Sequence, residues 1–526
     1  MHKFSSLVVV LFSLVMTQSV CVIQRTSAQV LVDDDFDGNG LVDQQIWRLP
    51  FLGDNAFYGP TEAKTDRSIH YPLMDGGTAR MQLDTFRDDG FGQSTGRFHG
   101  AELITKRNFA VAGGLRFNVR CRMIEPVGGL VGAAFMFAVQ RENNQGSLVR
   151  DEIDFELLSN VTNGVLTNFW NEGTFFGDDA AGSPVFFVPD PAFDLTEFQE
   201  YRLDWFEDRI EWFVNDELLR VQTIDVADDP MNFHMNLWVP DAGFFGAFNA
   251  DLQPAASFAQ NEIFEFEIDR VEIEQLNTMR SDNLLLDSSF EDPAFPFFSL
   301  NNGGNVDQAA TGRWIAFNNV NFSNSQSNTG NRSLSMFGPF SGGPNASGIF
   351  QNVDVVAGEV LEASVFCRTN AGDSIAGQAN FTSINLEFLD GNGNLIPGLG
   401  PFLSANEKES VILEGRDPNV PENRWVQQHV NAIVPPNAVR ARATLFFLQL
   451  ENGPGATFFD DFELVRLSPM DVLLGDVNQD GVVNLLDVAP FVILVANGQF
   501  QSEGDINMDG VVNLLDVDPF VQLLAN

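Results

Sequence analysis

The stretch that most constrains how this chain can fold is residues 151–158, in which acidic and apolar side chains alternate. Glu152, Asp154 and Glu156 are the acids, and the residues between them are apolar. Because successive side chains of a β-strand point to opposite faces, this period of two predicts a strand with one acidic and one apolar face. The apolar face can pack into a core. Carboxylates side by side raise one another's pKa, which favours a substrate, a metal ion or a shared proton nearby.

Two carboxyl groups on one face indicate glycoside hydrolysis. In a retaining glycosidase they lie about 5–5.5 Å apart; one attacks the sugar carbon, and the other protonates the leaving oxygen and then activates water. The Cα atoms of Glu152 and Glu156 would lie about 13 Å apart on a strand, a distance that two long side chains can close on a concave face. Asp154 between them can hydrogen-bond the nucleophile and help to keep the acid/base partner protonated. A solvated acidic face or a calcium site is the alternative.

The same segment resembles the active-site strand of glycoside hydrolase family 16, whose signature is Glu-x-Asp-x-Glu with or without one extra residue. Here the extra residue is absent. This form is similar to that of bacterial lichenases and plant xyloglucan transglycosylases, whereas laminarinases, agarases and κ-carrageenases usually have the longer form. The resemblance implies that Glu152 is the nucleophile, Asp154 its helper and Glu156 the acid/base.

Further segments resemble other strands of this family, in the same order and with similar spacing. They are residues 113–119, 128–137, 166–171, 201–205, 210–216 and 235–238. The resemblance covers residues 31–275 and implies a β-jelly-roll catalytic domain. Short strands, frequent turn signals and little helical periodicity agree with a mainly β fold of two sheets.

Five residues are expected to bind the substrate. Trp170 and Trp238 are the aromatic residues that we place in the cleft, because flat rings stack on the apolar faces of pyranose units. Asn168 and Asn236 are expected to bond to hydroxyl groups. Glu102 resembles a family acid that reaches the subsites before the cleavage point.

Two positions depart from the lichenase pattern. Ile104 stands where lichenases have an Arg, and Gln199 replaces the usual His two residues before a Tyr. Both departures leave the exact glucan open. Trp205 and Trp212 fit a place in the core better than one in the cleft.

The N-terminal segment predicts export. Lys3 is followed by an apolar run over residues 7–16 and by small residues near Ala28, the layout of a cleaved secretory signal over residues 1–28. The run is too short for a membrane anchor. We therefore expect a secreted, extracellular protein, either free or attached to the cell surface.

The cysteine content and the net charge exclude some kinds of cross-link and of binding partner. After cleavage Cys121 and Cys367 remain in different predicted units, which leaves no disulfide framework. Both are expected to be buried apolar side chains. The formal net charge of −43 argues against nucleic acid and anionic membranes as partners.

Residues 283–467 are expected to form a second β-sandwich. The two ends of this segment look like the first and last strands of jelly-roll carbohydrate-binding modules. Trp314 and Trp425 could serve as sugar platforms or pack in the core. A spacer module without a ligand is the alternative.

The C-terminal part contains a repeat: residues 476–487 return as residues 505–516. Oxygen-bearing side chains occupy loop positions 1, 3, 5, 9 and 12, a backbone carbonyl falls at 7 and Gly at 6, which is typical of a calcium loop. The expected Ca²⁺ ligands are Asp476, Asn478, Asp480, Val482, Asn484, Asp487, Asp505, Asn507, Asp509, Val511, Asn513 and Asp516. The calcium is expected to be structural, and none is expected to take part in catalysis.

Each loop leads into an apolar stretch, residues 488–496 and 517–525, of a length that suits a short helix. Two such units with no helix before the first resemble a type I dockerin over residues 475–526, which implies a cohesin-bearing partner. Leucine pairs at 485–486 and 514–515 stand where cellulosomal dockerins usually have small hydroxyl residues. This departure favours another secreted or cell-surface protein as the partner.

The leading functional hypothesis is a secreted, endo-acting, retaining β-glycosidase that cuts a β-1,3-1,4- or β-1,3-glucan through a covalent intermediate on Glu152. A transglycosylase would use the same residues. A glycan-binding surface protein without activity is the third possibility, and the intact set of Glu152, Asp154 and Glu156 argues against it.

Overall fold

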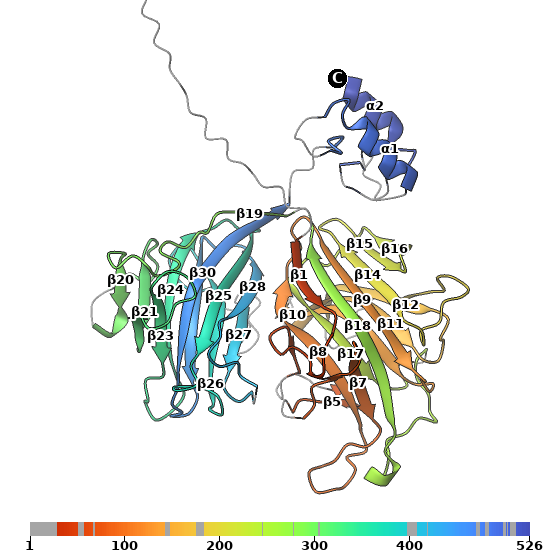
Figure 1. Cartoon of the computed structure of the whole chain (residues 1–526), viewed down its shortest axis with the longest axis horizontal. Coiled ribbons are helices and arrows are strands. Elements are labelled where there is room, and N and C mark those ends of the chain that lie inside the picture. The colour runs from red at the N-terminus through yellow and green to blue at the C-terminus, as the bar shows by residue number, and fades with distance from the viewer. Residues whose placement is uncertain are drawn as a thin grey trace, which may run out of the picture.

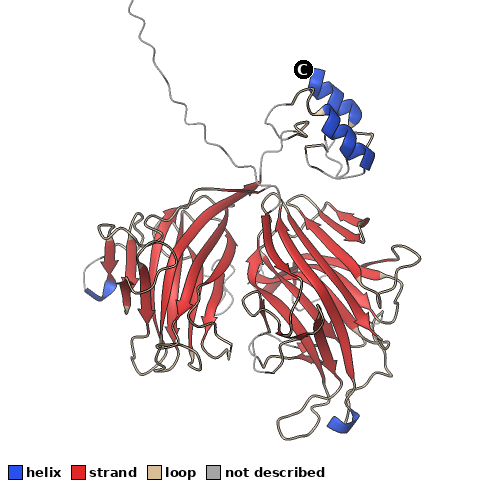
Figure 2. Ribbon diagram, in the orientation of Figure 1, coloured by secondary structure: helices blue, strands red, loops and turns tan. Residues whose placement is uncertain are grey.

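The computed structural model describes most of the chain after the expected secretory signal. The described residues are 29–50, 57–66, 69–142, 148–174, 183–244, 246–276, 278–302, 306–396, 408–417, 419–469, 474–478, 483–497, 501, 503–504, 506 and 512–525. The signal predicted over residues 1–28 therefore lies outside the described residues. Two β-units lie side by side, and a small helical part lies beyond one end of them (Figures 1 and 2).

The first β-unit comprises residues 29–276. Its elements are β1 (Gln29–Asp34), β2 (Gly40–Leu41), β3 (Trp47–Arg48), β4 (Phe57–Tyr58), β5 (Thr61–Ala63), β6 (Leu73–Met74), β7 (Ala79–Asp84), β8 (Phe98–Phe109), β9 (Leu115–Ile124), β10 (Val131–Glu142), β11 (Leu148–Leu158), β12 (Val165–Thr174), β13 (Val185–Phe187), β14 (Gln199–Trp205), β15 (Ile210–Val214), β16 (Glu217–Gln222), β17 (Met231–Trp238), the 3₁₀ turn η1 (Phe258–Gln260) and β18 (Ile263–Gln275).

These strands form two layers. One layer has the order β13-β12-β11-β10-β17-β8-β3. In the other, β18 pairs with β1, β7 and β9, and the sheet continues through β14, β15 and β16. A single apolar core draws side chains from both layers. The expected mainly β chain with a jelly-roll sandwich in its first part is confirmed.

Strand β9 shows why this sequence folds into layers. Its residues alternate between buried and partly exposed from end to end, with Leu115, Phe117 and Cys121 facing the core and Arg116 and Arg120 facing outward. Because the period of a strand is two, this alternation fixes which face is buried. Cys121 is a free, buried thiol, as expected.

The second β-unit comprises residues 278–469. Its elements are β19 (Thr278–Arg280), β20 (Phe297–Ser299), the 3₁₀ turn η2 (Leu300–Asn302), β21 (Trp314–Phe317), β22 (Val320–Ser323), β23 (Ser333–Phe337), β24 (Asn345–Asp354), β25 (Val360–Thr369), β26 (Asn380–Leu389), β27 (Lys408–Glu414), β28 (Val426–Ile433), β29 (Arg440–Gln449) and β30 (Ala456–Pro469). They form two six-stranded sheets, β22-β23-β30-β25-β28 with β19 beside β30, and β20-β21-β24-β29-β26-β27.

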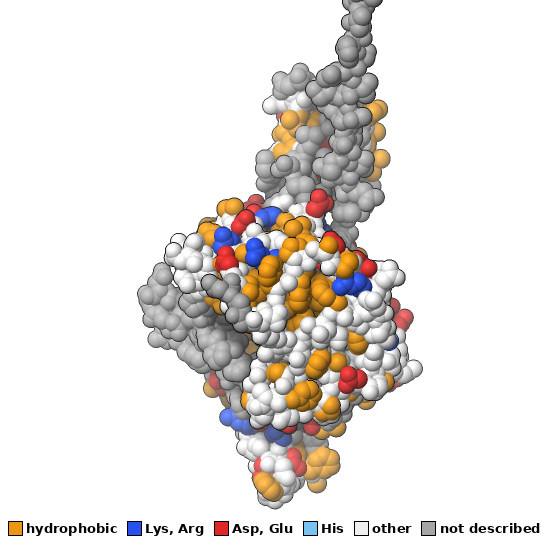
Figure 3. All heavy atoms as spheres, turned by 90° about the vertical axis from the view of Figure 1, so that its left-hand side faces the viewer, with side chains coloured by type: hydrophobic (Ala, Val, Ile, Leu, Met, Phe, Trp, Pro, Cys, Tyr) orange, Lys and Arg blue, Asp and Glu red, His pale blue; other side chains and the backbone are white. Residues whose placement is uncertain are grey.

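The two sheets of the second β-unit share one core, and Trp314 lies in it with no exposed surface. Its ring stacks on that of Phe462 at a centroid distance of 6.1 Å. Trp314 is therefore a packing residue and not a sugar platform. The exposed aromatic rings of this unit include Phe298 and Phe340, and hydrophobic side chains gather on its face away from the first β-unit (Figure 3). Cys367 is buried and free, as expected.

A buried carboxylate joins the two β-units. Glu362 of β25 is 1% exposed and binds Arg107 of β8 and Arg280 of β19. Burial alone would raise the pKa of Glu362, but the charges of Arg107 and Arg280 hold it well below its usual range. The carboxylate is thus ionised, and it is paired with one arginine from each β-unit.

A pair of asparagines fixes the same junction through three hydrogen bonds. The backbone N–H of Asn431 donates to Asn108 Oδ1 at 2.8 Å, its side-chain amide donates to the Asn108 carbonyl at 2.8 Å, and the Asn108 amide donates to the Asn431 carbonyl at 2.9 Å. Directional bonds of this kind set the orientation of one unit against the other.

The C-terminal part contains α1 (Val488–Asn497) and α2 (Val517–Ala525), where the sequence predicts short helices. Phe491 and Phe520 stack at a centroid distance of 4.2 Å in its small apolar core. In the part of the chain that the structure describes, neither these helices nor any other combines the length and apolar character required to cross a bilayer.

We expect Glu362→Gln to lower the free energy of unfolding by about 3–5 kcal/mol, because it leaves Arg107 and Arg280 without a charged partner at a buried site. Denaturant unfolding followed by circular dichroism measures this loss. Glu463→Gln is the matched control: Glu463 is 49% exposed and lies 3.9 Å from Arg280, so its loss should stay within about 0.5 kcal/mol. Equal losses in the two variants would contradict the role of Glu362.

Candidate active site

Three carboxyl groups project from one face of β11. The apolar residues between them, Ile153 and Phe155 among them, belong to the core of the sandwich, so Glu152, Asp154 and Glu156 face outward from the layer. From the core side, the indole N–H of Trp212 donates to the backbone carbonyl of Asp154 at 3.1 Å. The core therefore holds the strand that carries the acids.

The neighbouring strand β12 places two of the expected substrate-binding residues beside these acids. Trp170 lies opposite Glu152, and Asn168 lies opposite Asp154. Because residues paired across an antiparallel ladder point to the same face, both side chains belong to the face of the three acids.

On the other side of β11, the register carries the face across β10 and β17 to β8. Glu156 pairs with Ala133, Ala133 with Asn236, and Asn236 with Glu102. The structure thus brings Glu102, Asn168, Trp170 and Asn236, which come from three strands, onto one sheet face with the acids of β11. Trp238 lies two residues beyond Asn236 on β17 and shares its face.

Burial raises the pKa of all three acids. For Glu156, burial and then the charge of Glu152 raise it to about 8. For Asp154, burial and the charges of Glu152 and Glu156 raise it well above its usual range, and Asp154 hydrogen-bonds Glu152. For Glu152, burial also raises the pKa, and the charge of Arg150, whose Nε lies 2.7 Å from the carboxylate, opposes that rise.

These environments divide the work among the three groups. Glu152 has a cation beside it, Asp154 hydrogen-bonds Glu152, and Glu156, with a pKa of about 8, is protonated at neutral pH. One site thus combines a carboxyl group next to a cation with a neutral carboxylic acid, an arrangement that suits a nucleophile and a general acid.

Glu102 is engaged by other side chains. It is 2% exposed, its Oε1 lies 2.8 Å from His234 Nδ1, and its Oε2 accepts a hydrogen bond from the Tyr58 hydroxyl. Glu102 can therefore bind a ligand only through the carboxylate lone pairs that His234 and Tyr58 do not use.

Asn168 and Asn236 offer unused acceptors. They are 9% and 4% exposed, and the side-chain oxygen of each is buried without a hydrogen-bond partner among the described residues. Buried polar atoms are nearly always paired in proteins. These two oxygens therefore suit donors from a bound ligand, such as sugar hydroxyl groups.

The four tryptophans of the first β-unit that were assigned to core or cleft differ in burial. Trp205 and Trp212 have no exposed surface and lie in the core, which confirms their predicted place. Trp170 and Trp238 are half-buried. The guanidinium of Arg150 lies over the Trp170 ring at 4.2 Å.

Three residues of this site were not predicted from the sequence. Arg150 stands two residues before Glu152 and His234 two before Asn236, so the period of two would have placed both on the acidic face. Tyr58 gave no signal, because its contact with Glu102 joins residues 44 apart in the chain.

A second acidic cluster lies at the end of β11. Asp151, Asp228 and Asp229 bring carboxylate oxygens within 4.8 Å of one another, close enough to hold a cation. The Asp151 carboxylate accepts the backbone N–H groups of Asp228 and Asp229 at 3.0 and 3.2 Å. These bonds tie the loop before β17 to the strand of the acids.

The two predicted calcium loops are described in part. Asp480, Val482, Asp505, Asn507, Asp509 and Val511 lie outside the described residues, whereas Asp476, Asn478, Asn484, Asp487, Asn513 and Asp516 lie within them. Asp476, Asp487 and Asp516 have no exposed surface, and residues 475–526 contain no Lys or Arg. Buried carboxylates require compensating positive charge, so this oxygen-rich donor set fits a calcium ion.

Residues 69–255 match the model of glycosyl hydrolases family 16. The β-glucanase of Brevibacillus brevis is 34% identical over 111 residues, 20% of this chain and 40% of that protein. Crh-like protein 2 of Botryotinia fuckeliana (strain B05.10) is 30% identical over 83 residues, 16% of this chain and 18% of that protein. The chain spans less than half the length of these relatives.

Solved structures that match part of this chain include a β-1,3-1,4-glucanase (lichenase) derived from a mouse hindgut metagenome, which is 19% identical with a TM-score of 0.35 and covers 48% of this chain and 100% of its own. The laminarinase from Rhodothermus marinus is 18% identical with a TM-score of 0.36, over 47% of this chain and 97% of its own. The segment that matches the family model contains all three acids of β11. Residues 69–255 are therefore similar to glycosyl hydrolases family 16, a family of glycoside hydrolases that act on O-glycosyl bonds.

Proposed function

We propose that the chain is an endo-acting, retaining β-glucanase that cuts a β-1,3-1,4- or β-1,3-glucan. The observation that carries this proposal is the division of protonation on β11, where Glu152 has a cation beside it and Glu156 has a pKa of about 8. An open sheet face, with substrate-binding residues drawn from several strands, suits a polymer that is cut within its length.

In this mechanism the Glu152 carboxylate attacks the anomeric carbon while Glu156 gives its proton to the departing glycosidic oxygen. The first product leaves and a glycosyl ester on Glu152 remains. Glu156, now a carboxylate, then takes a proton from water as that water attacks the same carbon, which frees Glu152 and restores the acid. Asp154 keeps its proton, donates a hydrogen bond to Glu152 and so orients the nucleophile in both steps.

The choice of glucan rests on the resemblance and on the relatives. The short form of the acidic signature favours β-1,3-1,4- and β-1,3-glucans, and one matching relative is named as a β-glucanase. Transfer of the glycosyl group to a sugar hydroxyl in place of water would use the same residues, and product analysis separates the two outcomes.

We further propose that residues 1–28 direct export, that residues 283–467 act as an accessory carbohydrate-binding or spacer module, and that the C-terminal repeat binds two calcium ions and docks to a secreted or cell-surface protein. Exposed leucines support the docking role. Leu485 and Leu514 are each 78% exposed, and Leu486 and Leu515 are 68% and 67% exposed. Equivalent apolar pairs on two repeats suit contact with a protein partner.

Replacing Glu152 by Ala should lower turnover of mixed-linkage β-glucan or laminarin by about three orders of magnitude or more, because the acids act as a unit on the bond that breaks. Binding should be retained, since Asn168, Asn236 and both tryptophans are unchanged. Reducing-sugar release and calorimetric binding measure the two effects. Glu200→Ala, an exposed acid on β14, is the control with normal activity. Loss of fold together with activity in Glu152→Ala would contradict the assignment.

The value of kcat/KM should fall as pH rises through about 8, by about tenfold for each further pH unit, because Glu156 must be protonated to act as the general acid. Below this pH the acid is protonated and the rate is not limited by it. An aryl glycoside whose leaving group requires no proton is the matched control. The rate of the first step, in which the glycosyl ester forms, should not fall above pH 8 with this substrate. A falling limb of the same pKa in Glu156→Gln would assign it to another group.

Excess chelator should unfold residues 476–526 while the β-units stay folded, because metal binding supplies much of the stability of so small a core. Far-UV circular dichroism should show loss of helical signal, and added calcium should restore it. Asp487→Ala should lose this signal without chelator. Asp518→Ala, an exposed acid on α2 outside the loop, should not. An unchanged helical signal in excess chelator would rule out the calcium role.

A further inference from the structure

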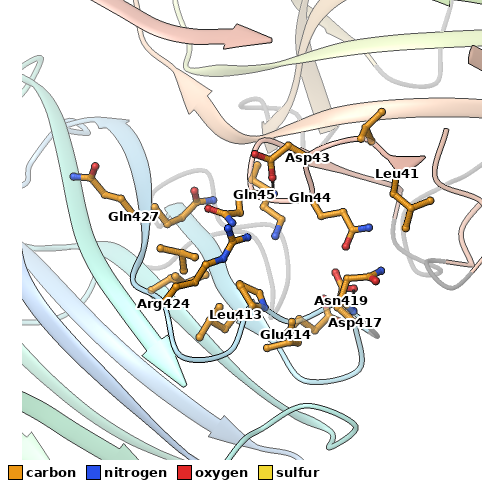
Figure 4. A pocket seen from close by; sticks show the side chains of 17 residues that line it. Leu41, Asp43, Gln44, Gln45, Leu413, Glu414, Asp417, Asn419, Arg424 and Gln427 are labelled. Atoms are coloured by element: carbon orange, nitrogen blue, oxygen red, sulfur yellow. Dashed lines mark hydrogen bonds between the residues drawn. The ribbon is translucent and has the colours of Figure 1, made fainter. Parts of the chain in front are cut away.

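A cavity of about 420 Å³ lies between the two β-units (Figure 4), and the three acids of β11 are not among the residues that line it. The first unit contributes Gln44 and Gln45 from the segment before β3, together with Lys106 of β8. The second unit contributes β27, the start of β28 and the segment between them, with Asn419 and Arg424. The volume falls within the range of about 300–1,000 Å³ that is usual for small-molecule sites.

The cavity reaches the strand that carries Glu102, because Lys106 of β8 lines it. Glu102, Ile104 and Lys106 are alternate residues of β8 and therefore point to the same face. The edge strand β3 pairs with this part of β8, since Arg48 lies opposite Ile104 and the Lys106 N–H donates to the Ile46 carbonyl at 2.8 Å. The register of β8 against β17 shifts between Ile104 and Asn108 by two residues, an even number that leaves the alternation unchanged. Lys106 thus opens the cavity onto the side of the sheet on which Glu102 lies.

The distance from β11 to β8 is one that a few sugar units of a glycan chain can span. Three strand spacings separate β11 from β8, about 14 Å at 4.7–4.9 Å each. A chain that crosses the sheet from Glu152 towards Glu102 would therefore reach β8 after a few sugar units. The cavity is lined by Lys106 of that strand and by residues just before its edge neighbour β3.

The second β-unit forms a fixed wall there. Strands β27 and β28 lie against β8, and the Asn108–Asn431 bonds and the Glu362 ion pairs hold the two units together. Because the wall is fixed, its side chains keep a constant distance from the acids.

The lining suits a neutral ligand rich in hydroxyl groups. Lys106 and Arg424 are balanced by Asp43, Glu414 and Asp417, a mixture that disfavours a strongly anionic chain such as a sulfated galactan.

One oxygen atom in the lining is available to accept a hydrogen bond from a ligand. The side-chain oxygen of Gln44 is buried without a hydrogen-bond partner among the described residues, and a sugar hydroxyl can satisfy it. Across the cavity Arg424 reaches Gln45, with Nη1 3.1 Å from the amide oxygen when the amide is turned to face it. The two β-units thus present their polar groups to the same space.

We propose that this cavity is a distal subsite of the glycan cleft, to which the second β-unit supplies one side. It binds a neutral glucan unit at least three units from the bond that is cut. The inference rests on the proposed β-glucanase function and extends it, because it makes the second β-unit part of the substrate site and not only an appendage.

The test compares chain lengths in the full-length protein. The substrates are β-1,3-gluco-oligosaccharides of three and eight units. The double variant Asn419→Ala/Arg424→Ala should lower kcat/KM about tenfold on the octasaccharide, equivalent to about 1.4 kcal/mol, and leave the trisaccharide unchanged. Arg416→Ala is the matched control, because Arg416 lies on the same segment, is exposed and does not line the cavity.

Two outcomes would overturn the subsite: wild-type kinetics on both lengths, or an equal fall on both, which would indicate a general structural effect. A wild-type protein inactive on laminarin and mixed-linkage glucan would instead contradict the proposed function. In that case calorimetry tests the subsite by itself, in protein that carries Glu152→Gln. Adding Asn419→Ala/Arg424→Ala to this protein should weaken octasaccharide binding and leave trisaccharide binding unchanged. Unweakened octasaccharide binding would count against it.

Discussion

The candidate active site depends on placing three carboxyl groups side by side on one strand, with Asp154 buried and Glu152 and Glu156 half-buried. Isolated charges in such a place would be costly. The structure makes the arrangement tolerable by a proton on Asp154 that bonds Glu152, a neutral Glu156, and the guanidinium of Arg150 beside Glu152. The same compensation creates the chemistry, because it leaves one carboxylate ready to attack and one acid ready to donate.

The rest of the first β-unit supports this strand. Core residues on its other face fix its position, and the indole of Trp212 binds the Asp154 backbone from beneath. Strands β12, β17 and β8 then set the distances between the acids and the side chains that can meet a sugar. The second β-unit is attached to β8 by a buried ion-pair network and by reciprocal amide bonds, so it bounds the same face.

Much of this site could be predicted from the alternation of residues. Period two placed the acids on one face and their apolar neighbours in the core. The core position of Trp205 and Trp212 followed instead from the usual burial of large aromatic residues. Arg150 was within reach of the same rule. The contacts of Glu102 with His234 and Tyr58 were not, because they depend on segments that no local pattern relates. Trp314 stayed open between core and platform until packing was known.

By itself the sequence determined the β-class of the chain, the strand of acids and the face on which they lie, because side-chain direction in a strand follows from spacing alone. Only the tertiary structure decided which residues of distant strands stand beside the acids, how their burial divides the protons, and that a polar cavity forms where the two units meet. Those features arise from strand register and from the packing of layers, which join residues far apart in the chain.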